Sequence, residues 1–313
     1  MARARRHLSV CLNPVLQKTL TLESLRENEV NRVRCHRIDA SGKGINVIRV
    51  LTQLGTEAAL LTQAGGRNRD RFLMLAAEDG LSVHWVESGS EIRSCYTLLS
   101  QKAATCTEIV EEAVPVSEGT EDRVRDAFDE LVSQHGSVII SGTKAAGFSD
   151  ELYPDLVRAA KTAGARVVLD VRGPDLLRSL AYRPDVIKPN FSEFAATFVT
   201  ESMPSEHVLD AELERCVVER MLELAREHGC VVVLTHGMRP TLVAEPGNGD
   251  VARVSVDPVV PLNTTGSGDA FTAGFSEALA AGASLVDAVE RGHACGRENA
   301  LQVRPGVIHT RER

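Results

Sequence analysis

The chain has 313 residues, and its 35 Lys and Arg against 43 Asp and Glu give a formal net charge of −8. Hydrophobic residues make up 43% of the chain and charged residues 25%, a composition typical of a folded globular protein that argues against intrinsic disorder. The acidic balance gives no support for binding nucleic acid or an anionic membrane surface, and no apolar run approaches the roughly 20 residues that span a bilayer.

The first residues are basic, but the apolar stretch after them is interrupted by Asn13 and Pro14. A secretory signal needs about 7–15 uninterrupted apolar residues, so we expect none here. The seven cysteines are an odd number, are widely scattered and form no C-x-x-C pair, which favours reduced thiols over disulfides or a zinc site. We therefore expect a cytoplasmic protein.

Two stretches, approximately 17–38 and 92–115, have the alternating polar pattern of extended chain. Within the second, residues 96–100 and 107–114 are predicted to be strands exposed on one side. These segments could form a small β-sheet lid beside the main domain, or a pair of hairpins with no moving role.

The segment ASGKGINVIRVLTQLG (40–55) predicts a glycine turn that leads into a helix. Lys43 and Asn46 lie at the start of that helix and could bind an anionic or hydroxylated ligand in a pocket. The simpler interpretation is a glycine turn with a solvated lysine.

From about residue 120, β-branched runs alternate with helical patterns. The predicted strands are 137–140, 166–171, 185–188 and 230–234, and the predicted helices are 121–134, 150–163, 191–198 and 209–228. This alternation predicts an α/β fold with a mostly parallel, doubly wound sheet that has helices on both faces. Segment 244–250 is interpreted as a turn between two extended runs, so we expect residues 1–313 to form one domain with the lid segments inserted in it.

The segment IKPNFSEF (187–194) lies at the carboxyl end of a predicted strand, the edge at which open α/β sheets bind ligands. Asn190 and Glu193 are one helical turn apart and could hold hydrated Mg²⁺ through water. Alternatively, Asn190 caps the helix and Glu193 completes a capping box.

The most informative segment is NTTGSGDAFTAGF (263–275). Its glycines expose backbone N–H groups at the positive end of a helix, which makes an anion site. Asp269 lies at that site and could take a proton from a hydroxyl while the N–H groups stabilise a transferred phosphoryl group. The alternative is that Asp269 only caps the helix. The chain has neither a P-loop nor a G-x-G-x-x-G after a strand, which argues against a P-loop NTPase and a Rossmann dehydrogenase.

In this order these segments resemble the PfkB, or ribokinase-like, carbohydrate kinases, and most of all their 1-phosphofructokinase and tagatose-6-phosphate kinase group. The similarity runs from about residue 8 to 308. It is carried by LNP (12–14), GKGINV (42–47), IRSCYTLL (92–99), TEI (107–109), SG (141–142), VVLD (167–170), IKPN (187–190) and GSGDAFTAGF (266–275).

The resemblance implies a ribokinase-like fold with a β-sheet lid that often forms a dimer contact, and hence a homodimer. It implies ATP as phosphoryl donor, Mg²⁺ as cofactor and a sugar phosphate as acceptor. Asp269 is similar to the catalytic base, and the backbone of Gly266, Ser267 and Gly268 to the anion hole. The other implied roles are Mg²⁺ and phosphate for Asn190 and Glu193, nucleotide contacts for Thr235, Gly237 and Asn299, and sugar or sugar-phosphate binding for Gln17, Gly42, Lys43, Asn46 and Arg93.

Several positions depart from the family pattern, mostly on the acceptor side. Gln17 stands where the family usually has an Asp, and Ser41 replaces the first glycine of G-G-K-G. The additional cations Lys144, Arg172 and Arg67 would suit an anionic acceptor. We expect phosphoryl transfer to be retained and the acceptor to differ. The alternatives are a kinase of an unphosphorylated sugar or nucleoside, and an inactive binding protein of the same fold.

Overall fold

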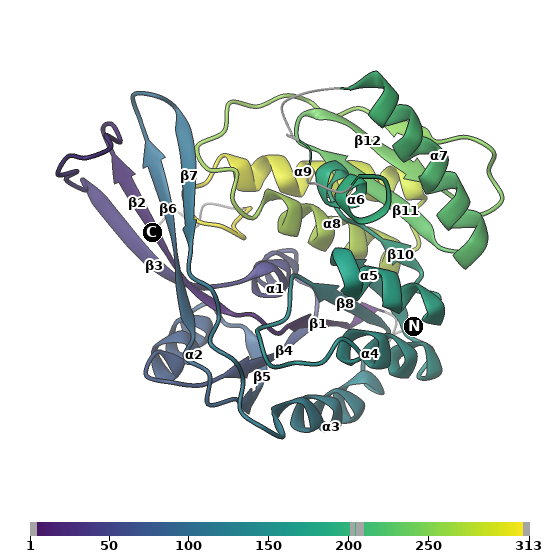
Figure 1. Ribbon diagram of the computed structural model, residues 1–313, viewed down its shortest axis with the longest axis horizontal. Helices are drawn as coiled ribbons and strands as arrows, with labels where there is room; N and C mark the ends of the chain where they lie inside the picture. The colour runs from purple at the N-terminus through teal and green to yellow at the C-terminus, as the bar shows by residue number, and fades with distance from the viewer. Residues whose placement is uncertain (1–4, 201–203, 205–209, 309–313) are drawn as a thin grey trace.

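A nine-stranded sheet forms the centre of the computed structural model, which describes residues 5–200, 204 and 210–308 (Figure 1). Its strands are β1 (His7–Cys11), β4 (Ala58–Ala64), β5 (Ser82–Glu87), β8 (Ser137–Ser141), β9 (Arg166–Asp170), β10 (Val186–Ile187), β11 (Val231–His236), β12 (Arg239–Ala244) and β13 (Ala252–Val254). The strand order is β13-β12-β11-β10-β9-β8-β1-β4-β5. All neighbours from β11 to β5 are parallel, and β12 and β13 add an antiparallel edge.

Helices cover both faces of this sheet. Residues of α1 (Lys43–Gln53), α8 (Ser267–Ala281) and α9 (Leu285–Ala300) share one hydrophobic cluster, and α2 (Arg69–Glu78) packs beside α1 in a smaller one. The opposite cluster contains residues of α3 (Thr120–Val132), α4 (Leu152–Thr162), α5 (Gly173–Ser179), α6 (Phe191–Phe198) and α7 (Ala211–His228). A short 3-10 helix, Leu180–Tyr182, follows α5.

The pleat of the strands explains how one β-branched run serves both clusters. Val138 and Ile140 pack with α3 and α4, whereas Ile139 between them packs with α1 and α8. Successive side chains of a strand point to opposite faces, so a strand covered on both sides has to be apolar throughout. The run at 137–140 is therefore the pattern of a central parallel strand.

A second sheet of four strands, which we name the small sheet, stands at one side of the molecule (Figure 1). It consists of β2 (Val15–Leu22), β3 (Cys35–Ser41), β6 (Arg93–Ser100) and β7 (Thr105–Val110), in the order β3-β2-β6-β7. Only Gly42 separates the end of β3 from the start of α1, so the small sheet is joined directly to the helix that carries Lys43 and Asn46.

The α/β fold with a mostly parallel, helix-covered sheet and a small second sheet is confirmed. Boundaries differ by a few residues. The first extended segment starts at Val15 and ends at Ser41, and β7 ends at Val110 rather than at 114. Asp210 caps α7, which begins at Ala211. The predicted helix start at 209 lies outside the described residues. Among the helices of the described part, none combines the length and the apolar character needed to cross a membrane.

Candidate active site

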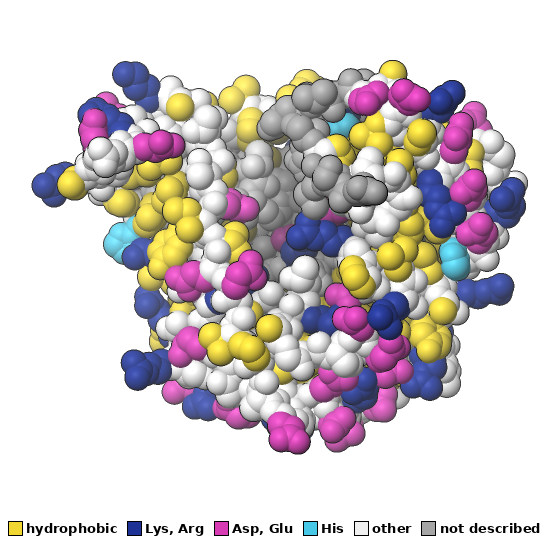
Figure 2. Space-filling view, in the orientation of Figure 1, with side chains coloured by type: hydrophobic (Ala, Val, Ile, Leu, Met, Phe, Trp, Pro, Cys, Tyr) yellow, Lys and Arg dark blue, Asp and Glu magenta, His cyan; other side chains and the backbone are white. Residues whose placement is uncertain are grey.

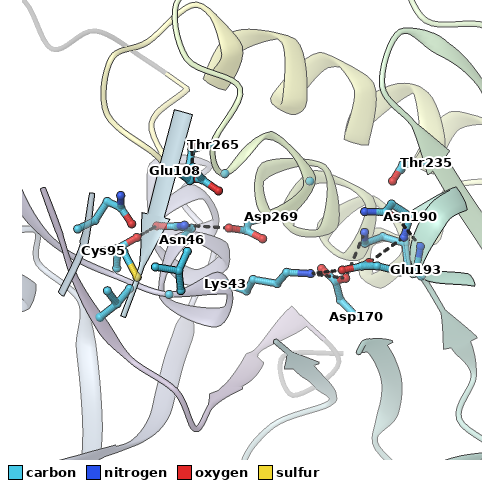
Figure 3. Close-up of a pocket in the computed structure, with 18 of the residues that line it drawn as sticks. Lys43, Asn46, Cys95, Glu108, Asp170, Asn190, Glu193, Thr235, Thr265 and Asp269 are labelled. Carbon is cyan, nitrogen blue, oxygen red and sulfur yellow. Dashed lines mark hydrogen bonds and ion pairs between the residues drawn. The ribbon is translucent and has the colours of Figure 1, made fainter. Parts of the chain in front are cut away.

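Polar side chains converge where the parallel strands end (Figure 3). Asp170 ends β9, Lys188 and Asn190 follow β10, and Thr235 lies near the end of β11. Together with the small sheet and the start of α8, they enclose a cavity of about 360 Å³. Of the predicted site residues, its walls contain Gln17, Gly42, Lys43, Asn46, Arg93, Asn190, Glu193, Thr235, Gly266, Gly268 and Asp269.

Gly266 and Gly268, which precede Asp269, differ in the space that their surroundings leave for a side chain. Gly266 caps α8 with a φ of 81°, in the left-handed region, and a Cβ there would lie 3.0 Å from Pro305 Cβ. Gly268 lies within the helix, and a Cβ there would meet no atom of the other described segments within 4 Å. The fold therefore requires glycine at 266, whereas at 268 glycine leaves space in the cavity.

Asp269 is a buried carboxylate rather than a helix cap. Its side chain is 6% exposed, and its Oδ2 accepts a 2.8 Å hydrogen bond from Nδ2 of Asn46 on α1. Burial, with a smaller contribution from the charge of Asp170, raises the pKa of Asp269 to about 6, against the opposing effects of Lys43, Asn46 and Lys188. A carboxylate with such a pKa is suited to accept a proton near neutral pH.

Two lysines neutralise the carboxylates beside this base. Lys43 Nζ lies 3.6 Å from Asp170 Oδ1 and 3.4 Å from Glu193 Oε1, and Lys188 Nζ lies 3.5 Å from Asp170 Oδ1 (Figure 3). Burial alone would lower the pKa of Lys43, but the surrounding carboxylates, Asp170 first, raise it overall. Lys43 therefore stays a cation inside the cavity.

Asn190 and Glu193 form a capping box at the start of α6. Asn190 Oδ1 accepts from the backbone N–H of Glu193 at 2.7 Å, and Glu193 Oε2 accepts from the N–H of Asn190 at 3.0 Å. The capping box that the sequence offered as the alternative to a Mg²⁺ site is thus present. It does not remove these residues from the site, because both also line the cavity and Glu193 pairs with Lys43.

The small sheet supplies the wall opposite Asp170. Gln17 is buried, and its Nε2 donates to Thr97 Oγ1 at 2.7 Å. Arg93 is half-buried, with one guanidinium nitrogen donating to the carbonyl oxygen of Glu111 at 2.8 Å. This end of the cavity therefore combines an amide and a cation.

A second cavity of about 900 Å³ adjoins the first, with Glu108, Asn190, Thr235, Thr265 and Gly268 common to both. Gly237 and Ser267 line it as well. The two cavities meet where α8 begins.

Comparison with known proteins supplies the family. The family model described as pfkB family carbohydrate kinase matches residues 12–308. The chain is a pfkB family carbohydrate kinase.

The relatives agree with this assignment over nearly the whole length of the kinase. It is 29% identical over 281 residues to a 1-phosphofructokinase of Rhodobacter capsulatus, covering 89% of this chain and 85% of that protein. The crystal structure of phosphofructokinase-2 from Escherichia coli in complex with fructose-6-phosphate superposes with a TM-score of 0.80 at 24% identity, covering 95% of this chain and 94% of that one. A putative ribokinase from Agrobacterium tumefaciens gives 0.80 at 14% identity over 97% and 93%. These superpositions show the ribokinase-like fold.

Asn299, for which a nucleotide contact is predicted, is a buried residue behind the loop before α8. It is fully buried and lines neither cavity. Its Nδ2 donates to Thr265 O at 3.0 Å and to Ser267 Oγ at 3.2 Å, and its Oδ1 accepts from Gly306 N at 2.6 Å. In this kinase Asn299 stabilises the loop before α8 through these hydrogen bonds. Its neighbours Gly296 and Ala300 line the larger cavity.

The additional cations of the sequence lie away from the smaller cavity of the kinase. Lys144 pairs with Asp175 and stands over the ring of Tyr153, Arg172 caps α5, and the side chain of Arg67 is exposed. None of the three lines the smaller cavity, so their positions give no support to the expectation that they suit an anionic acceptor. Ser41 causes no backbone strain, because it ends β3 in extended conformation. Its hydroxyl donates to Asn46 Oδ1 at 3.0 Å.

No role was predicted for Asp170 and Lys188, although both lie in segments that carry the family resemblance, 167–170 and 187–190. Their signal was positional, since each comes at the carboxyl end of a predicted strand. Glu108 and Thr265 were also missed. Thr265 Oγ1 donates to Glu108 Oε1 at 2.8 Å, which joins β7 to the loop before α8.

The two glycines of the α8 start predict opposite outcomes for the same substitution. Gly268→Ala should leave the free energy of unfolding unchanged or raise it by about 0.5–1 kcal/mol, since alanine is the better helix former, while phosphoryl transfer falls on the order of 10²-fold because the methyl group occupies the cavity. Gly266→Ala should lower the stability by about 1–2 kcal/mol. Denaturant unfolding and a kinase assay on both variants measure this, and a fully active Gly268→Ala protein would contradict it.

Proposed function

We propose that this kinase transfers the γ-phosphoryl group of ATP to a hydroxyl of a sugar phosphate, in the manner of a 1-phosphofructokinase or a tagatose-6-phosphate kinase. The observation that carries the proposal is the position of Asp269, a buried carboxylate on the wall of the smaller cavity, directly after Gly268, which lines both cavities. The name of the Rhodobacter relative and the fructose-6-phosphate bound by the Escherichia coli structure support a phosphorylated acceptor.

The smaller cavity is the proposed acceptor site. Arg93 supplies a planar cationic group that can pair two phosphate oxygens, and Gln17, Lys43 and Asn46 offer hydrogen-bond partners for sugar hydroxyls. Gly42, with a φ of 125°, keeps the turn before α1 tight, because a Cβ there would lie 2.9 Å from Cys11 Sγ.

In the proposed reaction the acceptor hydroxyl attacks the γ-phosphorus, Asp269 takes its proton, and ADP leaves as the bond between the γ-phosphorus and the β,γ-bridging oxygen breaks. The backbone N–H groups of Gly266 and Gly268 at the positive end of α8 stabilise the charge that develops on the phosphoryl oxygens, and Lys43 adds a fixed cation. The N–H of Ser267 donates to Thr264 O at 3.2 Å and would have to leave that oxygen to join them. ATP occupies the larger cavity with Thr235 and Gly237 on its wall. These effects are positioning and electrostatics, which is what phosphoryl transfer requires.

Asn190 and Glu193 fit a magnesium ion that keeps its own water molecules. Their oxygens already take part in the capping box, and among the described residues no three His, Cys, Asp or Glu side chains gather as a ligand set. Mg²⁺ usually keeps several waters and binds one or two carboxylates plus substrate phosphates. When bound, it would neutralise phosphate charge, and Glu193 would orient its water shell.

A screen for ADP release with Mg·ATP tests the proposal. The acceptors are fructose 1-phosphate, fructose 6-phosphate, tagatose 6-phosphate, fructose, ribose and a nucleoside. We expect turnover with at least one sugar phosphate at a kcat/KM well above that of the unphosphorylated compounds. Preference for a free sugar or nucleoside would overturn the acceptor class, and no ADP release with any acceptor, together with tight sugar-phosphate binding, would identify an inactive binding protein.

Arg93→Ala should raise the KM for the phosphorylated acceptor by about 10- to 100-fold, because a bidentate charge-assisted pair is lost, and should leave the KM for ATP in place. Initial-rate kinetics with both substrates varied measure it. Arg123→Ala is the matched control, since Arg123 also donates to a backbone carbonyl oxygen at 2.8 Å but lies outside the cavity. Equal acceptor KM values for wild type and Arg93→Ala would favour an unphosphorylated acceptor.

A homodimer through the small sheet and a cytoplasmic location complete the proposal. Hydrophobic side chains gather over the small sheet in Figure 2, and Val30, Val33, Ile109 and Val110 are exposed. All seven cysteines are free thiols, which suits a reducing compartment. Sedimentation equilibrium measures the oligomeric state.

A further inference from the structure

The carboxamide of Asn46 lies between the proposed base and two hydrogen-bond donors. On one side its Nδ2 donates to Asp269 Oδ2 at 2.8 Å (Figure 3). On the other side its Oδ1 accepts from Arg49 Nη1 at 2.9 Å and from Ser41 Oγ at 3.0 Å. All four side chains are at least nine-tenths buried.

Arg49 determines which way this amide faces. A guanidinium group only donates hydrogen bonds, so the amide atom beside it has to be the oxygen. The NH₂ group must then face Asp269. The opposite orientation would place the NH₂ against a cation and the carbonyl oxygen against a carboxylate, two repulsive contacts in a buried site.

Arg49 is itself held from three parts of the chain. Its Nε pairs with Asp79 after α2 at 3.0 Å, its Nη1 also donates to Pro305 O at 3.2 Å, and its Nη2 donates to the carbonyl oxygen of Ala40 on β3. A Cβ on Gly306 would lie 3.0 Å from Nη1 of Arg49 and 3.0 Å from Cα of Asn46, so the C-terminal loop packs against both.

We propose that Arg49 and Ser41 are positioning residues that lock the Asn46 amide toward Asp269, so that Asp269 Oδ2 is engaged and Oδ1 is left to take the proton of the acceptor hydroxyl. This inference rests on the proposed function. It gives Ser41 a role, because its hydroxyl on β3 of the small sheet joins the donor set, and it makes the alignment of the base depend on where that strand lies.

Asp269 is titrated in a mixed electrostatic environment. Lys43 on α1, Asp170 at the end of β9, Lys188 after β10 and the thiol of Cys11 on β1 all interact with it electrostatically. The hydrogen bond from Asn46 lowers the pKa of Asp269 against the effect of burial. Weakening the lock should therefore raise that pKa.

The variants Ser41→Ala and Arg49→Lys test whether these two residues orient the Asn46 amide. The first removes one hydroxyl donor, and the second replaces the guanidinium group with an ammonium group. Ser9→Ala is the matched control. The hydroxyl of Ser9 on β1 is also buried and donates at 3.0 Å to α1. Its acceptor is the carbonyl oxygen of Gly44 rather than the side chain of Asn46.

In both test variants kcat should fall, with the KM for ATP unchanged, and the acid limb of kcat/KM should move up by as much as about one pH unit, more in Arg49→Lys than in Ser41→Ala. In Ser9→Ala the pH profile should match that of the wild type even if the unfolding midpoint falls. Profiles of Ser41→Ala and Arg49→Lys that superpose on the wild-type profile, with reduced stability only, would overturn the inference.

Titration of the Asp269 carboxyl carbon by NMR in the ligand-free protein separates this result from the proposed function. A higher pKa in the two test variants than in wild type and Ser9→Ala supports the lock whether or not any acceptor is turned over, and equal pKa values in all four proteins reject it. Absence of ADP release by the wild-type protein across the acceptor screen would instead reject the proposed function.

Discussion

Asp269→Asn should lower kcat on the order of 10²- to 10⁴-fold, the usual loss when a general base is removed. The asparagine keeps the size of the side chain and can still accept the hydrogen bond from Asn46, so the cavity is preserved while the ability to take a proton is lost. We therefore expect the KM values for ATP and acceptor to change little. Single-turnover kinetics measure the chemical step directly.

Asp287→Asn is the matched control for this change. Asp287 occupies the third position of α9 as Asp269 does in α8, but it is exposed. Among the described residues its side chain bonds only within its own cap, where the hydroxyl of Ser284 donates to its Oδ2 at 2.7 Å. Wild-type turnover is expected in this variant. Near-normal kcat in Asp269→Asn would remove Asp269 from the role of base.

The raised pKa of Asp269 fixes the expected pH dependence. The base works only when ionised, and its pKa is about 6, so kcat/KM should fall as the pH drops through about 6, about two units above the point expected for an exposed aspartate. The same shift opposes folding, since the folded state favours the protonated acid, and its contribution to stability therefore falls as the pH rises from about 4 to 6. A kcat/KM profile flat to pH 5 would contradict the assignment.

Asp170→Asn should lower the free energy of unfolding by about 3–5 kcal/mol, because it leaves two lysines without their shared carboxylate. Asp170 is 2% exposed and also accepts from Ser141 Oγ and Thr272 Oγ1, each at 3.2 Å. Burial raises its pKa, but Lys188, Lys43 and these hydroxyls lower it overall. Its contribution is thus present at neutral pH and is lost as the pH falls through that lowered value.

Asp150→Asn provides the comparison for an exposed ion pair. Asp150 lies 3.3 Å from Arg178, with 59% of its side chain exposed, and loss of such a pair costs about 0–1 kcal/mol. Urea unfolding of the two variants at pH 7 gives both values. A loss below about 1 kcal/mol in Asp170→Asn would mean that water reaches the lysines and replaces the carboxylate.

Local sequence predicted most of the secondary structure. Residues 191–198 form α6 with the predicted bounds, and 137–140 lies within β8, because hydrophobic period and β-branched composition act within a few residues. Boundaries in the small sheet shifted, since its strands are exposed and pairing between distant segments sets their length. β2, for example, pairs with β6, which lies about eighty residues later in the chain.

Residues from several segments were predicted to line the site, and most of them do, but the contacts between those segments could not be predicted. The glycines around Ser267 indicated the loop before α8, whereas the fully buried position of Asn299 depends on Gly306 and Thr265, which come from different segments. Lys144 had the right charge for an anionic acceptor, but its partner Asp175 holds it elsewhere.

The sequence by itself determined the local backbone and the type of chemistry: a glycine-rich turn around Ser267, a helix that begins there, and a carboxylate at the start of that helix. Only the tertiary structure decided what that carboxylate can do. Its pKa depends on burial and on Asn46, Lys43 and Asp170, and Asn46 lies 223 positions away in the chain. Desolvation and Coulomb interactions depend on distance through space, and folding sets that distance.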